Sequence, residues 1–343
     1  MSDDRTSILL QEAWQRLWQY YWDDSRLRFY QWWPRQDASC PWADNWAFGA
    51  VLAATAATWQ ALGQPDWMHA HLAQLRQSLV EYANGRARGY ASTVGVMPPG
   101  DTYYDDNAWV GLASFEMSGA NEWDQVAYDV YDFLLEGFDG ESGGVFWKET
   151  PKASLHVCST GPTLLLGAQL FRRDPARIAK EPLTRMLTWL EAMRSPDGRY
   201  WDHLRPGDGL IDKTFYTYNS GTPIHAMSIL EGAAPEFHFE ASVQATVRAL
   251  PLFLDDQGRL PDTPWFNAVL LRALQAVRTV YGLDTPLISV YRDHMAGALN
   301  HMTATRDPLS VLQQTNLKSG DVLLLRDAAA AVEILSRLVV FPL

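Results

Sequence analysis

The stretch Pro98-Pro-Gly-Asp-Thr-Tyr-Tyr-Asp-Asp-Asn-Ala-Trp-Val-Gly-Leu-Ala113 contains the pattern on which the fold prediction rests. Its first residues are turn formers, and its last residues follow the spacing of an α-helix. The same order recurs along the chain: a loop rich in Gly, Pro, Asp and aromatic residues leads into a helical pattern. The sequence therefore predicts a mainly α-helical protein whose helices are joined by irregular loops.

Hydrophobic periodicity predicts about twelve helices. They span residues 6–23, 43–62, 65–84, 104–119, 121–137, 153–173, 176–194, 218–232, 238–255, 264–282, 286–303 and 321–337. Short extended pieces at 144–147 and 199–201 can pair briefly, but no long alternating strand pattern is present.

Twelve helices fit either an open solenoid of helix pairs or a closed (α/α)6 barrel, in which six helical hairpins form a double ring. A solenoid shows a sequence repeat of fixed period, whereas the linkers here differ in length and content. No linker is long or polar enough to mark a domain boundary. We therefore predict an all-α fold, a single (α/α)6 domain over residues 1–343.

The composition is that of a folded protein. Of the 343 residues, 47% are apolar and 20% are charged, which excludes a disordered chain. The formal net charge of -12 argues against nucleic acid as a partner, because phosphate binding needs clustered Lys and Arg. No stretch of about 18 apolar residues is present, so no membrane span is predicted.

Location, redox state and cofactors are only weakly constrained by the sequence. The segment Met1–Ser7 lacks the apolar core of a secretory signal, so a cytoplasmic location is expected. Cys40 and Cys158 allow one disulfide but imply no framework. We expect no cofactor and no metal, because the chain has neither a Gly-rich phosphate loop nor a His-Glu-x-x-His motif. The oligomeric state is not indicated.

Tryptophan is unusually abundant, with 15 residues, eight of them before residue 60. Trp14, Trp18 and Trp22 repeat every four residues and form one helical stripe, which indicates core packing. Flat aromatic faces also stack on the apolar faces of pyranose rings, so some of these side chains suit sugar binding.

The strongest candidate for chemistry is the pair Asp105 and Asp106, predicted to lie at a helix N-terminus. Asp is favoured there simply by the helix dipole, by about 0.3–1 kcal/mol. Two features favour a catalytic role instead. Tyr103, Tyr104 and Trp109 flank the pair, and adjacent carboxylates repel unless one is protonated. An ionised and a protonated carboxyl side by side are what glycoside cleavage requires.

Three further turns combine glycine or a helix start with aromatic and polar residues. They are Gly143-Gly-Val-Phe-Trp-Lys148, Gly198-Arg-Tyr-Trp-Asp-His203 and Tyr216-Thr-Tyr-Asn-Ser-Gly221. Asn219 and Ser220 could equally be plain helix caps. His156, His203 and His225 could line the mouth of the barrel, although a single helical histidine is more often a core or surface residue.

These motifs together resemble glycoside hydrolase family 76, the endo-α-1,6-mannanases. The family's Tyr-Tyr-Asp-Asp followed by Trp is similar to Tyr103–Trp109. Its Gly-Gly-aromatic-Trp turn resembles Gly143–Trp147, its Gly-x-x-x-Asp turn resembles Gly198–Asp202, and its Tyr-Asn-Gln-Gly helix start resembles Tyr218–Gly221. The order and rough spacing match from about residue 10 to residue 300.

The resemblance implies an (α/α)6 barrel and a retaining mechanism, with Asp105 as nucleophile and Asp106 as acid/base. It implies an oligosaccharide or polysaccharide substrate with α-linked mannose, such as α-1,6-mannan. Substrate contacts are expected from Tyr104, Asn107, Trp109, Trp147, Asp202, Tyr218 and Asn219, with Trp42 and Trp46 as weaker candidates.

Two departures from the family pattern fall where substrate contacts are expected. The family's Lys-Asn-Ala run corresponds here to Lys152-Ala-Ser-Leu-His-Val-Cys-Ser159, and the glutamine of Tyr-Asn-Gln-Gly is Ser220. Other functions stay open at this point. An unsaturated glucuronyl hydrolase or a sugar epimerase uses the same barrel, and an epimerase would need His156 or His225 as acid and base. A non-catalytic glycan-binding protein would need neither aspartate.

Overall fold

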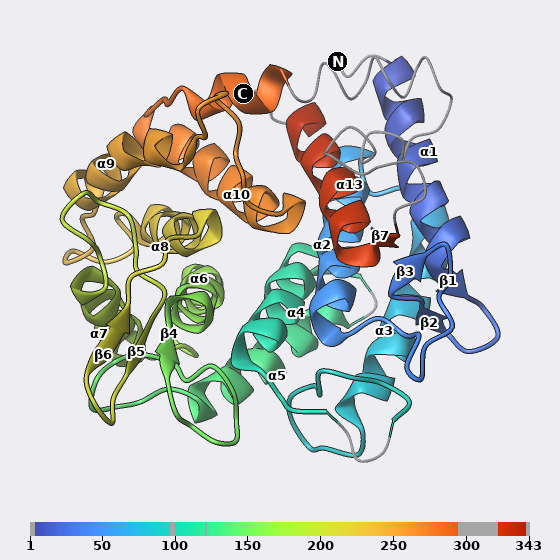
Figure 1. The fold of residues 1–343 in the computed structure, drawn as a ribbon, viewed down its shortest axis with the longest axis horizontal. Coiled ribbons are helices and arrows are strands. Elements are labelled where there is room, and N and C mark those ends of the chain that lie inside the picture. Colours follow the sequence, from blue (N-terminus) through green and yellow to red (C-terminus); the bar gives the residue numbers. More distant parts are fainter. Residues whose placement is uncertain (1–3, 97–99, 121, 294–321, 341–343) are drawn as a thin grey trace.

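The computed structural model describes residues 4–96, 100–120, 122–293 and 322–340, and these are mainly α-helical (Figure 1). Six of the described helices surround the middle of the molecule. They are α2 (Asn45–Ala61), α4 (Tyr104–Glu116), α6 (Val157–Arg173), α8 (Thr217–Leu230), α10 (Pro264–Tyr281) and α13 (Leu325–Val340). Each packs against the next, and α13 packs against both α10 and α2, so the inner ring is closed.

Between inner helices the chain passes through an outer one. The outer helices are α1 (Asp4–Tyr21), α3 (His69–Ala83), α5 (Trp123–Glu136), α7 (Lys180–Ala192) and α9 (Glu240–Ala249). Residues 287–293 are helical too, and the remainder of the predicted helix 286–303 lies outside the described residues. The predicted (α/α)6 barrel is confirmed. The contact of α13 with α2 is incompatible with an open solenoid.

Most helix ends lie within a few residues of the prediction, and three ends differ for local reasons. The start of 65–84 is a 3-10 helix, η1 (Asp66–Met68), before α3 begins. The predicted helix 153–173 starts later, because Leu155–His156 form strand β4. The end of 238–255 is a second 3-10 helix, η2 (Leu250–Phe253), which contains Pro251 and its missing N–H.

Most residues of α2, α4, α6 and α8 are buried, so these inner helices must approach their neighbours closely. Gly111 of α4 illustrates this: a Cβ at this position would lie 2.5 Å from Leu166 Cδ2 of α6. Gly221 of α8 faces the backbone of α10 in the same way, because a Cβ there would lie 3.1 Å from Leu270 Cα. Any side chain at either position would push two helices of the ring apart.

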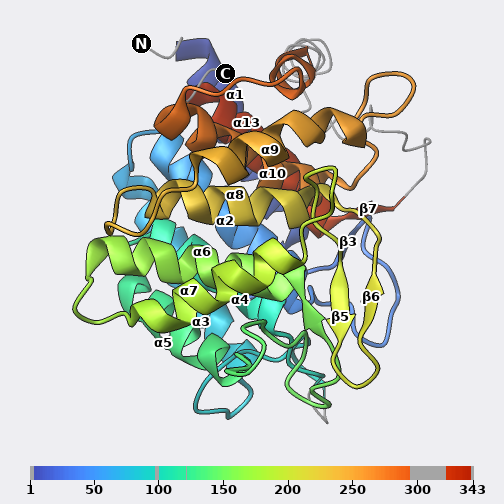
Figure 2. The same ribbon diagram turned by 90° about the vertical axis from the view of Figure 1, so that its left-hand side faces the viewer.

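The described strands are short, and they gather at one end of the barrel (Figure 2). They form three antiparallel sheets: β1 (Trp22–Asp23) with β2 (Arg28–Phe29), β3 (Trp32–Trp33) with β7 (Leu323–Leu324), and β4 (Leu155–His156) with β5 (His203–Arg205) and β6 (Leu210–Asp212). In the last sheet His156 lies directly opposite His203. The strands thus fix the loops that surround this end of the ring.

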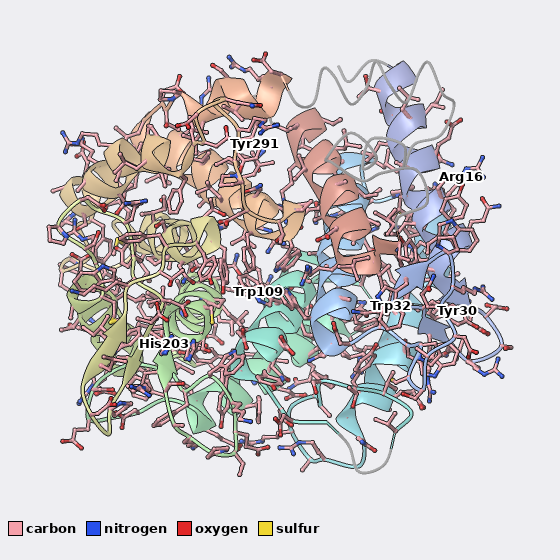
Figure 3. The ribbon with its side chains drawn as sticks, viewed as in Figure 1. Arg16, Tyr30, Trp32, Trp109, His203 and Tyr291 are labelled. Carbon is pink, nitrogen blue, oxygen red and sulfur yellow. The ribbon has the colours of Figure 1, made fainter. Side chains whose placement is uncertain are left out.

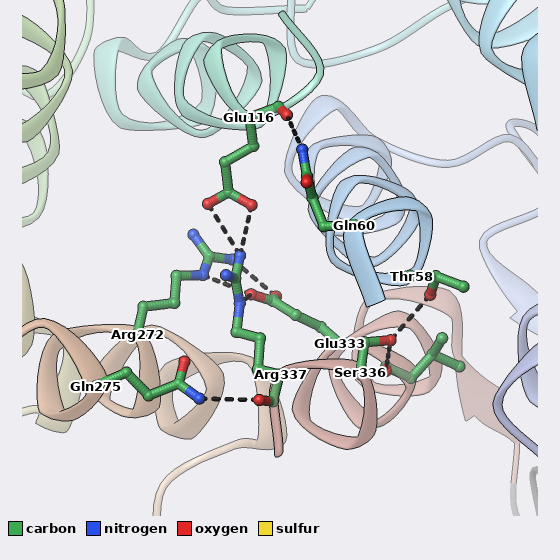
Figure 4. Close-up of polar contacts among 9 residues, drawn as sticks. Thr58, Gln60, Glu116, Arg272, Gln275, Glu333, Ser336 and Arg337 are labelled. Atoms are coloured by element: carbon green, nitrogen blue, oxygen red, sulfur yellow. Dashed lines mark hydrogen bonds and ion pairs between the residues drawn. The ribbon is translucent and has the colours of Figure 1, made fainter. Parts of the chain in front are cut away.

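The opposite end of the ring contains a buried ion-pair network (Figure 4). Glu333 of α13 accepts two hydrogen bonds from Arg272 of α10, at 2.5 and 2.7 Å, and one from Arg337 at 2.5 Å. Arg337 also donates to both carboxylate oxygens of Glu116, at the end of α4. Burial alone would raise the pKa of Glu333, but the two guanidinium groups outweigh it and lower that pKa to about 2.

The predicted tryptophan stripe on α1 is partly core. Trp14 and Trp18 are buried, and the Trp14 Nε1–H donates to Thr55 Oγ1 at 3.2 Å, whereas Trp22 is half-buried. The possible disulfide is absent, since Cys40 and Cys158 are both free thiols. None of the helices in the described ranges combines the length and the apolar character that a bilayer crossing requires.

Candidate active site

A cleft of about 490 Å³ opens at the end of the barrel where the inner helices begin. Helix N-termini carry partial positive charge, so several of them around one cleft favour bound anions and ionised carboxylates. The lining residues are Asp44, Trp46, Ser92, Tyr103, Asp105, Asp106, Trp109, Trp147, His156, Cys158, Asp202, Tyr216, Tyr218 and Phe266. Figure 3 shows Trp109 near the middle of the ring and His203 on the β5 side of it.

The predicted pair Asp105 and Asp106 lies in this cleft, in the first turn of α4. The turn Gly143–Trp147 is hydrogen-bonded to the start of α4, because the Tyr104 N–H donates to the Trp147 carbonyl at 2.9 Å. This attachment places the Trp147 indole against the pair, where its Nε1–H donates to Asp105 Oδ2 at 3.3 Å. The structure therefore brings together two motifs that are about forty residues apart in the sequence.

The pKa values of both carboxyls are raised, but to different extents. Burial raises the pKa of Asp105 to about 7, and the Cys158 thiol, the Trp147 indole and backbone N–H groups at the helix start limit this rise. Burial raises the pKa of Asp106 well above its ordinary range, and the negative charges of Asp105 and Asp44 raise it further. Asp105 is thus the carboxyl that ionises first, and Asp106 keeps its proton.

Asp202 also lines the cleft and is the centre of a polar cluster. Asn219 of α8 donates through Nδ2 to Asp202 Oδ1 at 2.9 Å, and His203 Nδ1 lies 2.9 Å from Asp202 Oδ2. His156 Nδ1 is 4.0 Å from the same oxygen. Burial, followed by the neighbouring His203, lowers the pKa of His156 to about 3, so this imidazole is neutral. Asn219 itself is buried and acts by orienting Asp202.

Stacked rings form two walls around the carboxylates. On one wall Trp147 stacks on His156 with centroids 5.2 Å apart, and His156 stacks on His203 at 4.4 Å. The β4–β5 pairing explains the second stack, because directly opposed residues share a face of the sheet.

The other wall consists of Trp46, Phe266 and Tyr218. Phe266 stacks on Tyr218 at 4.0 Å and on Trp46 at 6.0 Å. A narrow cleft with flat apolar sides and polar groups at its base is suited to a sugar ring.

Three of the predicted substrate contacts require correction, and one of them, Asn219, is buried beside Asp202 and does not line the cleft. Tyr104 is buried and stacks on Phe133 at 5.1 Å, away from the cleft. Asn107 is also buried, and all three of its hydrogen bonds go to backbone: Nδ2 donates to the Tyr90 and Tyr103 carbonyls, and Oδ1 accepts from the Tyr90 N–H. Tyr104 packs against α5 and Asn107 holds the loop at Tyr90, and neither residue lines the cleft.

The remaining predicted positions divide clearly. Trp109, Trp147, Asp202 and Tyr218 line the cleft. Of the weaker candidates, Trp46 lines it as well. Trp42 instead packs against Tyr30 at 4.8 Å and is not among the lining residues.

His225 belongs to the other end of the ring. Burial and the charges of Arg337 and Arg272 lower its pKa to about 3, which places it beside the ion-pair network. Of the three histidines, only His156 and His203 belong to the cleft region.

Several lining residues were not predicted from the sequence. Asp44 precedes α2, Cys158 is in the first turn of α6, and Phe266 is in the first turn of α10. Their shared signal is position: each lies within a few residues of the start of an inner helix.

Within the described residues, His156, Asp202 and His203 are the one group whose side chains could hold a metal ion together. In this structure both Asp202 oxygens already have protein partners, Asn219 and His203. The two imidazole planes are within 10° of parallel, whereas metal ligands point their nitrogens at a common centre. The arrangement fits a hydrogen-bonded cluster better than a metal centre.

Comparison with known proteins identifies relatives over the whole barrel. The family model described as glycosyl hydrolase family 76 matches residues 10–340. A family 76 glycoside hydrolase from a bovine Bacteroides thetaiotaomicron strain superimposes with a TM-score of 0.82 and 21% identity, covering 98% of this chain and 78% of that one.

A second solved structure is an inactive variant of the α-1,6-mannanase GH76A of Salegentibacter sp. HEL1_6, bound to α-1,6-mannotriose. Two consecutive aspartates are replaced by asparagine in that variant. Its TM-score is 0.76 at 16% identity, with 98% of this chain and 99% of that chain covered. At these identities the two solved structures support the fold.

A curated relative matches a smaller part of the chain. The Meiotically up-regulated gene 191 protein of Schizosaccharomyces pombe is 28% identical over 180 residues, which cover 46% of this chain. The match spans 39% of that protein's own length.

Proposed function

This chain belongs to glycosyl hydrolase family 76, and from that membership we propose that it is a retaining glycoside hydrolase acting on α-1,6-linked mannosides. The observation that carries the proposal is the pair Asp105 and Asp106, which share one cleft at a helix N-terminus and have unequal pKa values. The α-1,6-mannanase described above is inactive when two consecutive aspartates are replaced, and it was captured with α-1,6-mannotriose. These two observations support the same substrate class for this chain.

In the proposed reaction Asp105 is the nucleophile. Its carboxylate attacks the anomeric carbon while the bond from that carbon to the leaving oxygen breaks, and Asp106 transfers its proton to that oxygen. A glycosyl ester on Asp105 results. Asp106, now ionised, takes a proton from water as the water attacks the same carbon and releases Asp105. Two displacements at one carbon return the product with its original configuration.

The proposed substrate contacts follow from the walls of the cleft. Trp147 and Tyr218, which belong to different ring stacks in the cleft lining, offer apolar faces to sugar rings. Asp202, held by Asn219, is placed to accept hydrogen bonds from sugar hydroxyls. Trp109 forms part of the cleft lining near the middle of the ring.

Product analysis with Asp106→Ala tests the assignment directly. Wild type should convert α-1,6-mannotriose to products that are initially α-anomers, as followed by proton NMR. Asp106→Ala should lose most activity on this substrate but keep it on 2,4-dinitrophenyl α-mannoside, whose leaving group needs no proton. Initial release of β-anomers would overturn the retaining mechanism. Equal losses on both substrates would remove Asp106 from the role of acid.

Trp147→Phe tests the contact that anchors the nucleophile. Phenylalanine retains a ring for stacking on His156 but lacks the Nε1–H that donates to Asp105. A hydrogen bond to a charged group contributes about 1.5–3 kcal/mol, so we expect kcat/KM to fall by about tenfold or more. Trp67→Phe is a matched control, because both indoles are 38% exposed and Trp67 lies in η1, outside the cleft. Equal effects of the two variants would contradict the contact.

The alternative of a sugar epimerase is disfavoured by the histidines. An epimerase needs an acid and a base on opposite faces of the sugar, whereas His156 and His203 are stacked on the same wall. His225 lies beside the ion-pair network rather than the cleft.

A further inference from the structure

Besides the catalytic pair, the cleft contains two carboxylates, Asp202 and Asp44, and Asp44 takes no part in bond cleavage as proposed. Asp44 is the N-cap of α2, and its Oδ1 accepts from the Ala47 N–H at 2.7 Å. Its Oδ2 accepts from Gln31 Nε2 at 2.9 Å, while its own N–H donates to Gln31 Oε1 at 2.9 Å. Both oxygens therefore have hydrogen-bond donors, and the side chain is fixed at the start of α2.

This fixed negative charge faces the catalytic pair. Helix α2 packs against α4, and Asp44 lines the same cleft as Asp105 and Asp106. Its charge adds to burial and to Asp105 in raising the pKa of Asp106. The main influences on Asp105 are different: burial, the Cys158 thiol, the Trp147 indole and backbone N–H groups. Asp44 thus adds a like charge that raises the pKa of Asp106.

The other titratable groups of the cleft do not supply an equivalent fixed charge. Cys158, Tyr216 and Tyr218 have raised pKa values, mainly from burial, and the pKa of His156 is lowered, so all four are neutral near pH 7. Tyr103 is neutral for the same reason. The cations of the last two inner helices lie behind aromatic rings of the cleft: Arg272 of α10 faces the Trp109 ring at 5.9 Å, and Arg326 of α13 faces the Trp46 ring at 4.0 Å. Asp202, the remaining carboxylate of the cleft, has its own partners and is not among the charges that raise the pKa of Asp106.

We propose that Asp44 is a positioning residue for catalysis, a clamped and ionised carboxylate whose charge keeps Asp106 in the protonated form that donates to the leaving oxygen. The inference rests on the proposed function, in which Asp106 is the acid. In this arrangement the difference between the pKa values of Asp105 and Asp106 follows from the positions of two helix starts. The start of α4 supplies Asp105 with donors, and the start of α2 supplies Asp106 with a repelling charge.

A titration of the free protein tests this without any substrate. The protein is labelled with 13C at the aspartate carboxyls, and the Asp106 signal is assigned from its loss in Asp106→Asn. In Asp44→Asn we expect the pKa of Asp106 to fall by about one unit, because a nearby like charge is removed. Asparagine caps helices as well as aspartate does, so α2 should be preserved, and Asp44→Ser provides a second capping variant.

Asp262→Asn is the matched control. Asp262 Oδ2 accepts from the Thr217 N–H at 2.7 Å, so it too stabilises the start of an inner helix, but it is not among the cleft residues. Its removal should leave the Asp106 titration unchanged. An unchanged Asp106 pKa in both Asp44 variants, or an equal shift in Asp262→Asn, would overturn the proposal.

Kinetics separate this role from direct sugar binding. On α-1,6-mannotriose, Asp44→Asn should move the basic limb of the kcat/KM profile to lower pH and leave the acidic limb in place. On 2,4-dinitrophenyl α-mannoside the profile should not move, because no proton is donated in the first step. A higher KM at every pH with both limbs unchanged would overturn the proposal in favour of a sugar contact. Absence of wild-type turnover on any α-mannoside would refute the proposed function instead, and the carboxyl titration would still decide the effect of Asp44 on Asp106.

Discussion

Asp105→Ala should reduce kcat/KM on α-1,6-mannooligosaccharides by about ten-thousand-fold or more, the scale seen when a nucleophile is deleted from an enzyme. The reason is structural as well as chemical. Asp105 is the ionising member of the pair and is anchored by the Trp147 indole, and no other carboxylate is placed in the first turn of α4 except the protonated Asp106. Activated aryl mannosides should not rescue this variant, in contrast to Asp106→Ala.

A control for Asp105→Ala is available in the loop that precedes α4. Asp101→Ala removes an exposed carboxylate that pairs with Lys148 at 2.8 Å and does not line the cleft, so kcat/KM should change by less than about threefold. Formate added to Asp105→Ala should restore part of the turnover on an activated substrate and give a product of inverted configuration. Substantial activity of Asp105→Ala without formate would leave a glycan-binding role as the better explanation.

The largest effect on stability is expected from Glu333→Gln. Glutamine leaves Arg272 and Arg337 buried with their positive charges uncompensated by Glu333, and breaking such a buried pair costs about 3–5 kcal/mol. Denaturant unfolding monitored by tryptophan fluorescence measures the loss. Glu181→Gln is the matched control, because Glu181 also pairs with an arginine four residues later, but on the exposed surface. That change should cost less than about 0.5 kcal/mol.

The pH dependence of stability provides an independent check. The folded protein holds the pKa of Glu333 near 2, below the ordinary value of 4.5. A carboxylate with a lowered pKa in the folded state stabilises fully above its unfolded pKa and loses that contribution as pH falls through the folded one. Wild type should therefore lose stability between about pH 4.5 and pH 2 more steeply than Glu333→Gln. Parallel curves for the two proteins would show that the network does not contribute as described.

The barrel could be predicted from periodicity, because inner and outer helices alternate along the chain. The site could be predicted only in part, for a geometric reason. The second residue of four inner helices faces the cleft: Trp46, Asp105, Cys158 and Tyr218. To find all four from the sequence, the start of each helix would have to be predicted with an accuracy of one residue. Hydrophobic periodicity is not that accurate. A helix predicted to begin at residue 43 contains Asp44, and this hides the role of Asp44 as a cap.

Closeness to a catalytic motif in the sequence is also a poor guide to which side chains face the cleft. Tyr104 and Asn107 neighbour the catalytic pair in sequence, but a helix turns each successive side chain by about 100°, so both point into the core. The stack of His156 on His203 depends on strand pairing between residues 47 positions apart, and strands of two and three residues are too short to be recognised in the sequence.

Closure of the ring by its last helix has a consequence for synthesis. Thr58 of α2 meets Ser336 of α13 at 2.9 Å, and Tyr21 donates to the Leu323 carbonyl across 302 residues of sequence. Such distant contacts form slowly, and until they form, a nascent chain exposes apolar helix faces to other molecules in the cell. Arg326, which stacks on Trp46 in the cleft wall, is synthesised long after Trp46, because it lies in the final helix of the ring. The cleft is therefore completed only once α13 has been made, and a chain that still lacks α13 is the form that most needs a chaperone.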